Sequence, residues 1–469
     1  MHKPVKCVKG KIGYRKKSVS GILAAVLMLF FLTACGQMPG EANTGGLQDW
    51  LAGRADVEGL QDWLTGRADV EGLQDWLTDG EAAVTESVTD CSGEAPQSGQ
   101  EPRMLTWQEL LETEEEYYQT AVDYTDPSAW EYCYQYLNES EKQWYRDIQR
   151  TLAGLMQDQE LSREGLEAGM TEEDIDRIFC YVLADHPEYF YVDGYRYTKY
   201  TRLDQLVKIE FTGSYTYDSE ECAYRWKEIT EAADRILEQA PAGEDDYEKV
   251  RYVYESLIRS TDYVMDAPDS QNLYSVLVNG ASVCQGYAKA TQYLLNHLGI
   301  PCVLVQGQVE PGEGHAWNLL YLDGEYYYVD TTWGDASYRQ TEAESDQVEW
   351  MPQVNYDYLC VTTQQLLRTH IPSSAVPLPE CTATRDNYYV REGCLLDTCE
   401  ETALQEAFNR ALSEGRQEIS LRCTGEAVYE ELLEHLITEK QVFTYLGRDY
   451  SSLHYARNEK QLSITFWFL

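Results

Sequence analysis

Apolar residues recur every three or four positions along several stretches of the chain after residue 104. This spacing predicts helices over residues 140–156 and 171–184, and a longer helix over residues 219–239. Thr106 and Glu109 stand in the Thr-x-x-Glu arrangement of a capping box, which predicts a further helix start at that point. The pattern therefore predicts a mainly helical beginning to the folded sequence, with strands where the spacing changes.

Runs that alternate apolar and polar residues predict strands and two hairpins. Asp193-Gly194 lies between Tyr-rich runs and predicts a hairpin over residues 189–200, which a strand over residues 208–217 follows. A second Asp-Gly pair, Asp323-Gly324, divides a longer alternating run at residues 315–333. Asp-Gly between such runs is typical of a type I′ turn, so a second hairpin is expected there.

A smaller folded unit follows the proline-containing stretch at residues 372–379. Its pattern predicts, in order, a strand near Tyr388, a helix over residues 402–413, a strand over residues 418–423, a helix over residues 427–438 and closing strands that end at Phe466. Mixed strands and helices of this kind predict a small α/β unit, in which the sequence shows no candidate site.

The amino terminus has the organisation of an export signal. Seven basic residues and no acidic ones precede or flank an apolar run at residues 22–32, which is short for a membrane-spanning helix. The next residues, Leu32-Thr33-Ala34-Cys35, resemble a bacterial lipobox. The resemblance implies a lipoprotein signal peptide at residues 1–34, lipidation of Cys35, and an extracytoplasmic protein anchored to the cell membrane. A plain secretory signal or an uncleaved anchor is the alternative.

A 13-residue unit recurs between residues 46 and 80, as GLQDWLAGRADVE, GLQDWLTGRADVE and the partial copy GLQDWLTDGEA. Each copy holds a single Leu-Gln-Asp-Trp-Leu cluster, which offers little apolar surface to bury. Because Ser, Thr, Glu and Gly dominate the segment after the repeats, we expect residues 35–103 to form a flexible tether. The alternative is a Trp-bearing binding array, through which the protein would act as a surface scaffold.

The balance of charge excludes one class of partner. The formal net charge is −43, and removal of the seven basic residues of the signal leaves 30 basic against 80 acidic residues. Such a polyanion repels phosphate backbones, so nucleic acid is not an expected partner. Solubility outside the cell and attraction of cationic substrates both remain open as reasons for the acidity.

The cysteines argue against a zinc site. The chain has 13 cysteines but neither a Cys-x-x-Cys pair nor a His-Glu-x-x-His motif, so no metal is expected. Export permits disulfides, and Cys394 and Cys399 are close enough in sequence to pair, although spacing alone does not establish a bridge. With Cys7 and Cys35 set aside, an odd number remains, so at least one thiol is expected to be free.

Cys284 is a candidate nucleophile because of its place in a predicted helix. Ser282 and Gln285 have the Ser-x-x-Gln form of a capping box, and Gly299 supplies a helix stop. A thiol in the first turn is close to unpaired backbone N–H groups and to the positive end of the helix dipole, which stabilise a thiolate. An inert core cysteine is the alternative.

The second predicted hairpin supplies a candidate base and its orienting acid. Its register would place Trp317 opposite Asp330, so that Asp330 is the diagonal neighbour of His315 on one face of the sheet. His315 could then take the proton of Cys284, while Asp330 fixes the imidazole tautomer. Asp335 lies past the paired region and is a weaker partner for His315.

The stretches SVCQGYAKA (residues 282–290) and GHAWNLLYLDGEYYYVDTTWGD (residues 314–335) together resemble the transglutaminase-like superfamily of bacterial surface and exported proteins. The resemblance covers roughly residues 245–363. It implies a papain-like α+β core with a Cys at a helix start and with His and Asp on adjacent strands. Matched residue by residue, it assigns the nucleophile, the general base and the orienting acid of a catalytic triad to Cys284, His315 and Asp330, and framing positions to Trp317, Asn318 and Trp333.

These observations predict an α+β protein in several parts. We expect an N-terminal α+β region at residues 104–244, the transglutaminase-like catalytic core at residues 245–372 and a small α/β C-terminal domain at residues 380–469. The oxyanion hole should include the backbone N–H of Cys284. The second donor stays open among Gln271, Asn272 and Tyr274, with Gln271 taken as the first candidate.

The resemblance implies acyl transfer at amide bonds through a thioacyl intermediate, with no cofactor. Hydrolysis by a peptidase or amidase is favoured, since bacterial relatives are often regarded as protease-like and no acceptor-lysine site is recognisable. Transglutaminase-type crosslinking or deamidation is one alternative, and a non-catalytic surface binding module is another. Expected substrates are peptides or proteins, including surface proteins and peptidoglycan stem peptides.

Overall fold

The computed structural model describes residues 129–202, 205–243, 245–309, 312–335, 353–447 and 453–467, all of which belong to one unit, Arg103–Leu469. The predicted signal peptide, the lipidation site Cys35, the repeats and the helix start at Thr106 lie outside the described residues. None of the helices within the described ranges combines the length and apolar character needed to cross a membrane.

Two helices of the N-terminal region begin at capping boxes. Helix α6 (Glu139–Ala153) begins after Asn138, whose side chain accepts from the N–H of Glu141 while the Glu141 carboxylate accepts in return. Helix α8 (Glu172–Asp185) begins in the same way after Thr171. Both helices were predicted to within a few residues. The remaining helical segments here are η1 (Cys133–Tyr136) and α7 (Arg163–Glu167).

The hairpin predicted at Asp193-Gly194 is wrong. Strand β2 (Val192–Arg202) runs through that pair and bonds to β3 (Gln205–Tyr215), with a register shift between Val192 and Gly194 that marks a bulge. Continuing the strand lets Tyr195 pack its ring 4.6 Å from Phe179 and 5.3 Å from Phe211. Aromatic packing therefore overrides the local turn signal. Strand β1 (Gln159–Glu160) completes a sheet of order β1-β3-β2.

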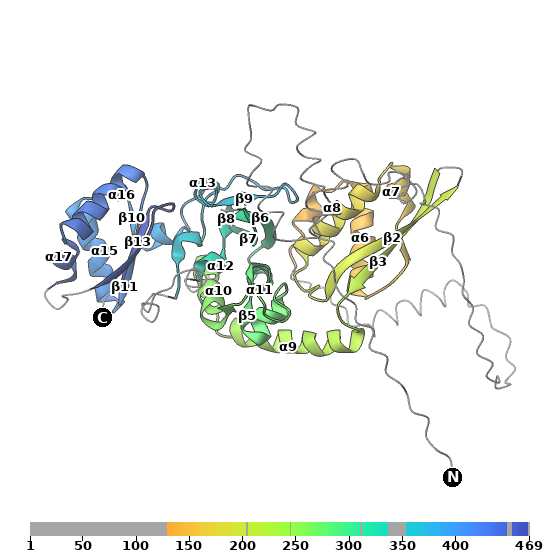
Figure 1. The fold of residues 1–469 in the computed structure, drawn as a ribbon, viewed down its shortest axis with the longest axis horizontal. Coiled ribbons are helices and arrows are strands. Elements are labelled where there is room, and N and C mark those ends of the chain that lie inside the picture. The colour runs from red at the N-terminus through yellow and green to blue at the C-terminus, as the bar shows by residue number, and fades with distance from the viewer. Residues whose placement is uncertain are drawn as a thin grey trace, which may run out of the picture. The chain divides into compact units, whose positions relative to one another are not determined.

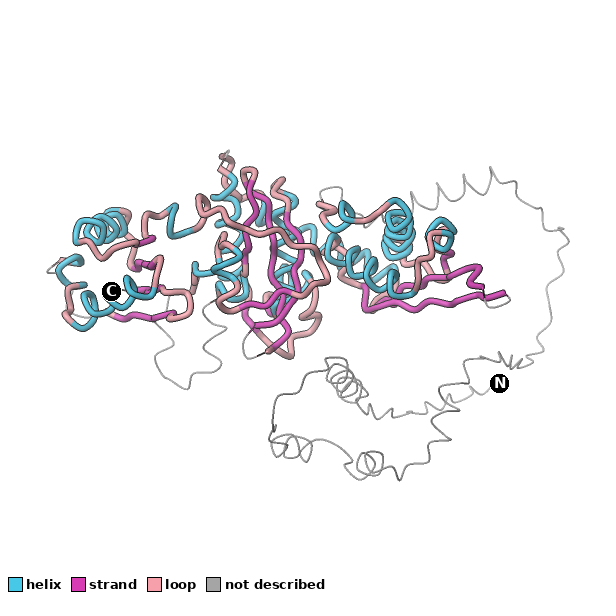
Figure 2. The backbone as a smooth tube through the Cα atoms, turned by 90° about the horizontal axis from the view of Figure 1, so that it is seen from above, coloured by secondary structure: helices cyan, strands magenta, loops and turns pink. Residues whose placement is uncertain are grey.

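The central part of the unit is a helix packed on an antiparallel sheet. Helix α11 (Cys284–His297) contacts β6 (Cys302–Val309) and β7 (Glu313–Leu322), as Figure 1 shows. With β8 (Glu325–Val329) and β9 (His370–Pro372) these strands form a sheet of order β8-β7-β6-β9. Figure 2 draws the strands in magenta. The other elements are α9 (Ser219–Leu237), α10 (Asp246–Ser260), β4 (Asp262–Tyr263), η2 (Ser275–Asn279) and β5 (Ala281–Ser282).

The second hairpin forms with the predicted turn. Asp323 has φ 49° and Gly324 has φ 89°, which are the two left-handed positions that a type I′ turn requires. The register pairs Leu322 with Glu325 and continues to Asn318 opposite Val329, as the sequence predicted.

Beyond that point the predicted register is wrong. Strand β8 ends at Val329, and Asp330 instead caps the short helix α12 (Thr331–Gly334), with its side chain accepting from the N–H of Trp333 at 3.1 Å. Asp330 is consequently not a strand residue, and it does not pair with Trp317 as predicted. Asp side chains compete with strand pairing by bonding to nearby backbone groups, which explains the early end of the strand.

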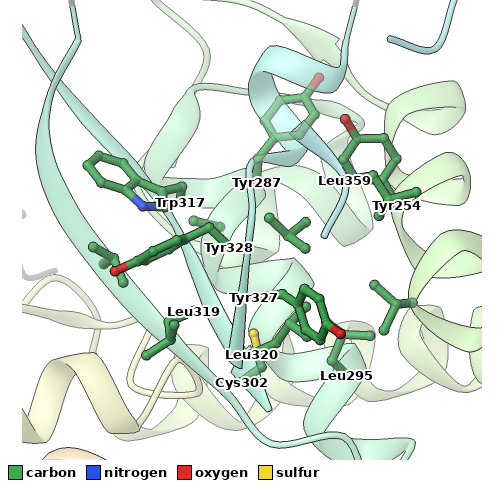
Figure 3. Close-up of a cluster of buried hydrophobic side chains, with 14 of the residues drawn as sticks. Tyr254, Tyr287, Leu295, Cys302, Trp317, Leu319, Leu320, Tyr327, Tyr328 and Leu359 are labelled. Atoms are coloured by element: carbon green, nitrogen blue, oxygen red, sulfur yellow. The ribbon is translucent and has the colours of Figure 1, made fainter. Parts of the chain in front are cut away.

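Buried aromatic and aliphatic side chains form the core around α11, α10 and the sheet. Figure 3 labels ten of them: Tyr254, Tyr287, Leu295, Cys302, Trp317, Leu319, Leu320, Tyr327, Tyr328 and Leu359. Asn318 ties the helix to the strands, because its amide donates to the carbonyl oxygen of Ala288 at 3.0 Å. The start of α11 is therefore held at a fixed place over the sheet.

The C-terminal residues form a second four-stranded sheet, of order β10-β11-β13-β12. The strand predicted near Tyr388 is wrong: Asn387 caps a short helix, α14 (Tyr388–Arg391), and the Tyr388 ring stacks 3.8 Å from that of Tyr356. The other C-terminal elements were predicted in their order. They are β10 (Leu395–Leu396), α15 (Glu401–Ser413), β11 (Glu418–Cys423), α16 (Glu426–Leu433), η6 (Glu434–Thr438), α17 (Val442–Leu446), β12 (His454–Asn458) and β13 (Ser463–Trp467).

Segregated helices and mostly antiparallel sheets make the fold α+β, as predicted. The segment between the two sheets adds η5 (Tyr356–Tyr358) and α13 (Thr363–Leu366). All ten cysteines within the described ranges are free thiols, and Cys394 and Cys399 are not joined.

Candidate active site

Cys284 is the first residue of α11, as the sequence predicted, but no capping box places it there. Val283 is the N-cap residue and makes no side-chain cap. Ser282 turns its hydroxyl to Ser275 at 2.6 Å, and Gln285 accepts from Gln306 at 3.2 Å. The first N–H groups of a helix have no intrahelical acceptor, so the half-buried thiol of Cys284 lies in an electropositive environment.

Close backbone packing fixes the first turn of α11. A side-chain carbon at Gly286 would lie 2.1 Å from the Ser282 hydroxyl oxygen and 2.9 Å from the backbone oxygen of Asn272. The next residue, Tyr287, donates its hydroxyl to the Asp335 carboxylate at 3.0 Å. Asp335, the weaker alternative to Asp330, is therefore bonded to the helix.

His315 and Asp330 form a buried pair. The Nε2 atom of His315, on β7, lies 2.7 Å from Oδ2 of Asp330, and the exposed fractions of the two residues are 6% and 1%. An ionised carboxylate only accepts, so Nε2 carries the proton and Nδ1 is the ring nitrogen left for another partner. The side chain of Cys284 acts on the same imidazole and helps to raise its pKa. The three predicted triad residues are thus brought together.

The electrostatics of the pair favour an imidazolium beside a carboxylate. Burial alone would lower the pKa of His315, but the charge and hydrogen bond of Asp330, with a contribution from Cys284, raise it to about 10. Burial would raise the pKa of Asp330, but His315 and His370 hold that pKa well below its usual range. Near neutral pH, His315 is therefore a positively charged imidazolium next to the Cys284 side chain.

His370 is the residue of this group that sequence reasoning missed. It lies on β9, is fully buried, and its Nε2 is 2.9 Å from the same Oδ2 atom of Asp330. His370 is 40 positions beyond Asp330 in the sequence, in a three-residue strand that ends at Pro372. So short a strand gives no periodic signal, and only its pairing with β6 brings this histidine to the site.

Two tryptophans enclose the histidine pair. The rings of Trp317 and Trp333 each lie 5.9 Å from the His315 ring, and they lie 5.0 Å and 4.8 Å from the His370 ring. Trp317 is fully buried and Trp333 is partly buried. These side chains exclude water from Asp330 and strengthen its hydrogen bonds.

The candidates for the second oxyanion donor are placed differently from one another. Asn272 uses its side-chain oxygen to accept from the N–H of Tyr274 at 2.9 Å, and Tyr274 donates its hydroxyl to Glu228 at 2.6 Å. Gln271 is exposed, in the loop beside the start of α11. The roles of Gln271 and of the Cys284 N–H in an oxyanion hole stay predictions.

One group of residues has the spacing of a metal site. The Nε2 atoms of His315 and His370 and a carboxylate oxygen of Asp330 all lie within 4.8 Å of one another. The two nitrogen–oxygen distances, 2.7 and 2.9 Å, are those of charge-assisted hydrogen bonds. Each of these nitrogens therefore carries a proton and has no lone pair to offer to a metal ion. We therefore describe the group as a hydrogen-bond network.

Comparison with known proteins finds similarity over part of the chain. Residues 233–331 match the Transglutaminase-like superfamily. Over 122 residues the chain is 28% identical to kyphoscoliosis peptidase from Mus musculus and 27% identical to the Homo sapiens protein. Each alignment covers 23% of this chain and 18% of the relative, so the chain spans less than a fifth of these relatives. A crystal structure of a TGase aligns with a TM-score of 0.22 and 15% identity, over 34% of this chain and 49% of that one.

Proposed function

We propose that the region around residues 233–331, which match the Transglutaminase-like superfamily, is a cysteine-nucleophile enzyme that acts on amide bonds. One observation carries the proposal: the imidazole of His315 is bonded through Nε2 to the buried Asp330 carboxylate, and Cys284 lies near enough to raise the pKa of the same imidazole. A thiol, a base and an orienting acid in this order are what nucleophilic catalysis requires.

The proposed reaction has two steps. The Cys284 thiolate attacks the amide carbonyl carbon, and the tetrahedral oxyanion is stabilised by backbone N–H groups at the start of α11. Collapse breaks the C–N bond, the His315 imidazolium gives its proton to the leaving amine, and a thioester to Cys284 remains. An acceptor then attacks the thioester while His315 takes the acceptor's proton; the C–S bond breaks, which releases the acyl product and restores the Cys284 thiolate and the imidazolium.

We favour water as the acceptor, which makes the protein a peptidase or amidase. A peptide mixture treated with the protein in H₂¹⁸O and a fluorescent primary amine separates the two outcomes. Hydrolysis gives new carboxyl termini that carry ¹⁸O, and transfer gives amine-labelled peptides. Amine labelling as the main product would overturn the preference for hydrolysis but would keep the thioacyl chemistry.

The substrate class is best sought with the protein and a Cys284→Ala variant side by side. Peptide libraries and purified peptidoglycan are incubated with each, and mass changes found only with the wild-type chain identify substrates. The His315→Gln variant should lose the same products, since the thiol then lacks its base. Products that persist in the Cys284→Ala variant would exclude the proposal, and a failure of both libraries together with an unreactive thiol would favour a binding module.

We also propose that the protein is an extracytoplasmic lipoprotein held at the membrane through Cys35. The supporting feature is the lipobox-like sequence Leu32-Thr33-Ala34-Cys35 after an apolar run. Metabolic labelling with an alkyne fatty acid should label the wild-type chain and not a Cys35→Ser variant, which should leave the membrane fraction. Equal labelling of both variants would contradict the assignment.

A further inference from the structure

Two histidines share one oxygen of a buried carboxylate. Oδ2 of Asp330 accepts from His315 at 2.7 Å and from His370 at 2.9 Å, while Oδ1 accepts from the N–H of Trp333 at 3.1 Å. Since an ionised carboxylate cannot donate, His370 presents a protonated Nε2. The two histidines reach Asp330 from two other strands, β7 and β9, whereas Trp333 belongs to the short helix that Asp330 caps.

The environment of His370 leaves it no freedom to act on a substrate. Its ring is fully buried, with Trp317, Trp333 and Tyr358 at 5.0, 4.8 and 5.5 Å. Its backbone is fixed by pairing with Val309 of β6. A histidine so enclosed can influence the reaction only through the groups it touches.

We propose that His370 is a positioning residue that holds the Asp330 carboxylate in the orientation in which His315 faces Cys284. Without the second donor, Oδ2 keeps a single partner, and the carboxylate is free to turn about its Cβ–Cγ bond between His315 and other donors. This inference rests on the proposed function, because positioning of Asp330 matters only where His315 activates a thiol.

The hydrogen-bond network continues outward from His370. Its Nδ1 lies 2.8 Å from the hydroxyl of Thr369, which fixes the ring against rotation. The amide nitrogen of Gln461, in the turn between β12 and β13, donates to the Gln365 carbonyl oxygen at 3.2 Å and lies 3.5 Å from the same Thr369 hydroxyl. The turn between β12 and β13 of the C-terminal sheet thus supports the segment that carries His370. This contact gives a structural role to the C-terminal domain, in which the sequence shows no candidate site.

A matched pair of variants tests the inference. In His370→Gln the side-chain amide nitrogen can reach the place of Nε2, whereas in His370→Asn it reaches only the place of Nδ1. Both variants bury an amide of similar polarity, so a merely structural role would affect them alike. His186→Gln is the control, because His186 is another buried histidine with a carboxylate partner, Glu188, at 2.7 Å.

The readout is the second-order rate of Cys284 alkylation by iodoacetamide, measured at the peptide level from pH 5 to pH 10, with Tm for each variant. We expect His370→Asn to lower the rate at pH 7 by about tenfold or more and to give a rate that rises steeply with pH, as for an unassisted thiol. His370→Gln should stay within about threefold of wild type and keep its pH profile. His186→Gln should change only Tm.

The failures are distinguishable. A wild-type Cys284 that reacts no faster than an ordinary thiol would overturn the proposed function and this inference with it. A fast wild-type thiol that depends on His315 but reacts equally in both His370 variants would overturn the inference alone. If His370→Asn does not fold, Thr369→Val is the second variant, because it removes the hydroxyl that holds the His370 ring and keeps the volume of the side chain at position 369. Thr369→Val must then lower the rate of Cys284 alkylation without changing the amount of folded protein. If it does not, the inference fails.

Discussion

At the scale of single residues, the site depends on an imidazole whose pKa is raised. Burial would lower the pKa of His315, and Asp330 with Cys284 raises it to about 10. Asp330 itself keeps its charge because two imidazoles and one backbone N–H surround it. The imidazolium beside Cys284 should therefore persist through neutral and mildly alkaline conditions.

This persistence predicts the pH profile of the thiol. Between pH 6 and pH 9 the rate of Cys284 alkylation should rise less steeply in the wild type than in His315→Gln, because the neighbouring imidazolium keeps its proton throughout that range and stabilises a thiolate. Stopped-flow reaction with iodoacetamide, followed by digestion and mass spectrometry, gives the rate. A rate that climbs about tenfold per pH unit between 6 and 8 would mean that His315 does not assist the thiol.

The same pKa shift predicts the pH dependence of stability. The pKa of His315 is about 10 in the folded chain and about 6.5 in an unfolded one. Its contribution to the free energy of unfolding is therefore fully present below about pH 6.5 and is lost as the pH rises through the folded value. The difference in urea stability between wild type and His315→Gln should shrink from pH 6 to pH 10, and a growing difference would contradict this assignment.

At the scale of secondary-structure elements, the first turn of α11 is the part most sensitive to bulk. Gly286→Ala would drive a carbon to 2.1 Å from the Ser282 hydroxyl oxygen, whereas Gly314, next to His315, has nothing within 4 Å of the same position. We expect Gly286→Ala to destabilise the fold by about 1–3 kcal/mol and to slow Cys284 alkylation.

Gly314→Ala is the matched control and should leave the free energy of unfolding within about 0.5 kcal/mol of wild type. Both values come from urea denaturation followed by fluorescence. Equal tolerance of the two substitutions would show that the start of α11 can move without consequence, and would remove the packing argument for the position of Cys284.

The sequence predicted an element correctly where residues close together in the chain determine its structure, and not where contacts between distant residues do. Local signals sufficed for the turn at Asp323-Gly324 and for β11 (Glu418–Cys423), whose bounds match the predicted strand. They failed at Asp193-Gly194, where Tyr195 finds ring partners in a strand that continues. They also failed at Asp330, where a side-chain cap ends the strand earlier than predicted.

The sequence predicted which residues form the catalytic triad of the candidate site, but it did not predict how the site is arranged around them. The order and spacing around Cys284 and His315 indicated the chemistry, and the structure brings these residues together. His370 was unpredictable because its contribution depends on a three-residue strand that pairs with β6, far away in sequence. Nothing local distinguishes that histidine from a solvent-exposed one.

At the scale of the whole molecule, one buried carboxylate joins the segment between β8 and β9 to the C-terminal domain. Asp357 accepts from the Tyr389 hydroxyl at 2.7 Å, from the Asn458 amide at 2.7 Å and from the Ser463 hydroxyl at 2.8 Å. Its exposed fraction is 2%. Removal of this acceptor leaves three donors without a partner in the interior.

Asp357→Ala should therefore lower the free energy of unfolding by about 3 kcal/mol, or roughly 1 kcal/mol for each bond lost. Asp397→Ala, at an exposed position of the same C-terminal region, should change it by less than about 0.5 kcal/mol. Urea denaturation of both variants measures the difference. A loss in Asp357→Ala no larger than in Asp397→Ala would mean that the two sheets are held together by apolar packing alone.

The most direct measurement of the central claim is a competition among the thiols of one folded chain. Limiting iodoacetamide at pH 7, followed by peptide-level quantification, ranks the reactivity of the ten described cysteines, nine of which serve as internal references for Cys284. The account predicts that Cys284 is modified first, and that His315→Gln removes this preference while leaving the other nine unchanged. A Cys284 that reacts no sooner than the exposed Cys180, with or without His315, would contradict it.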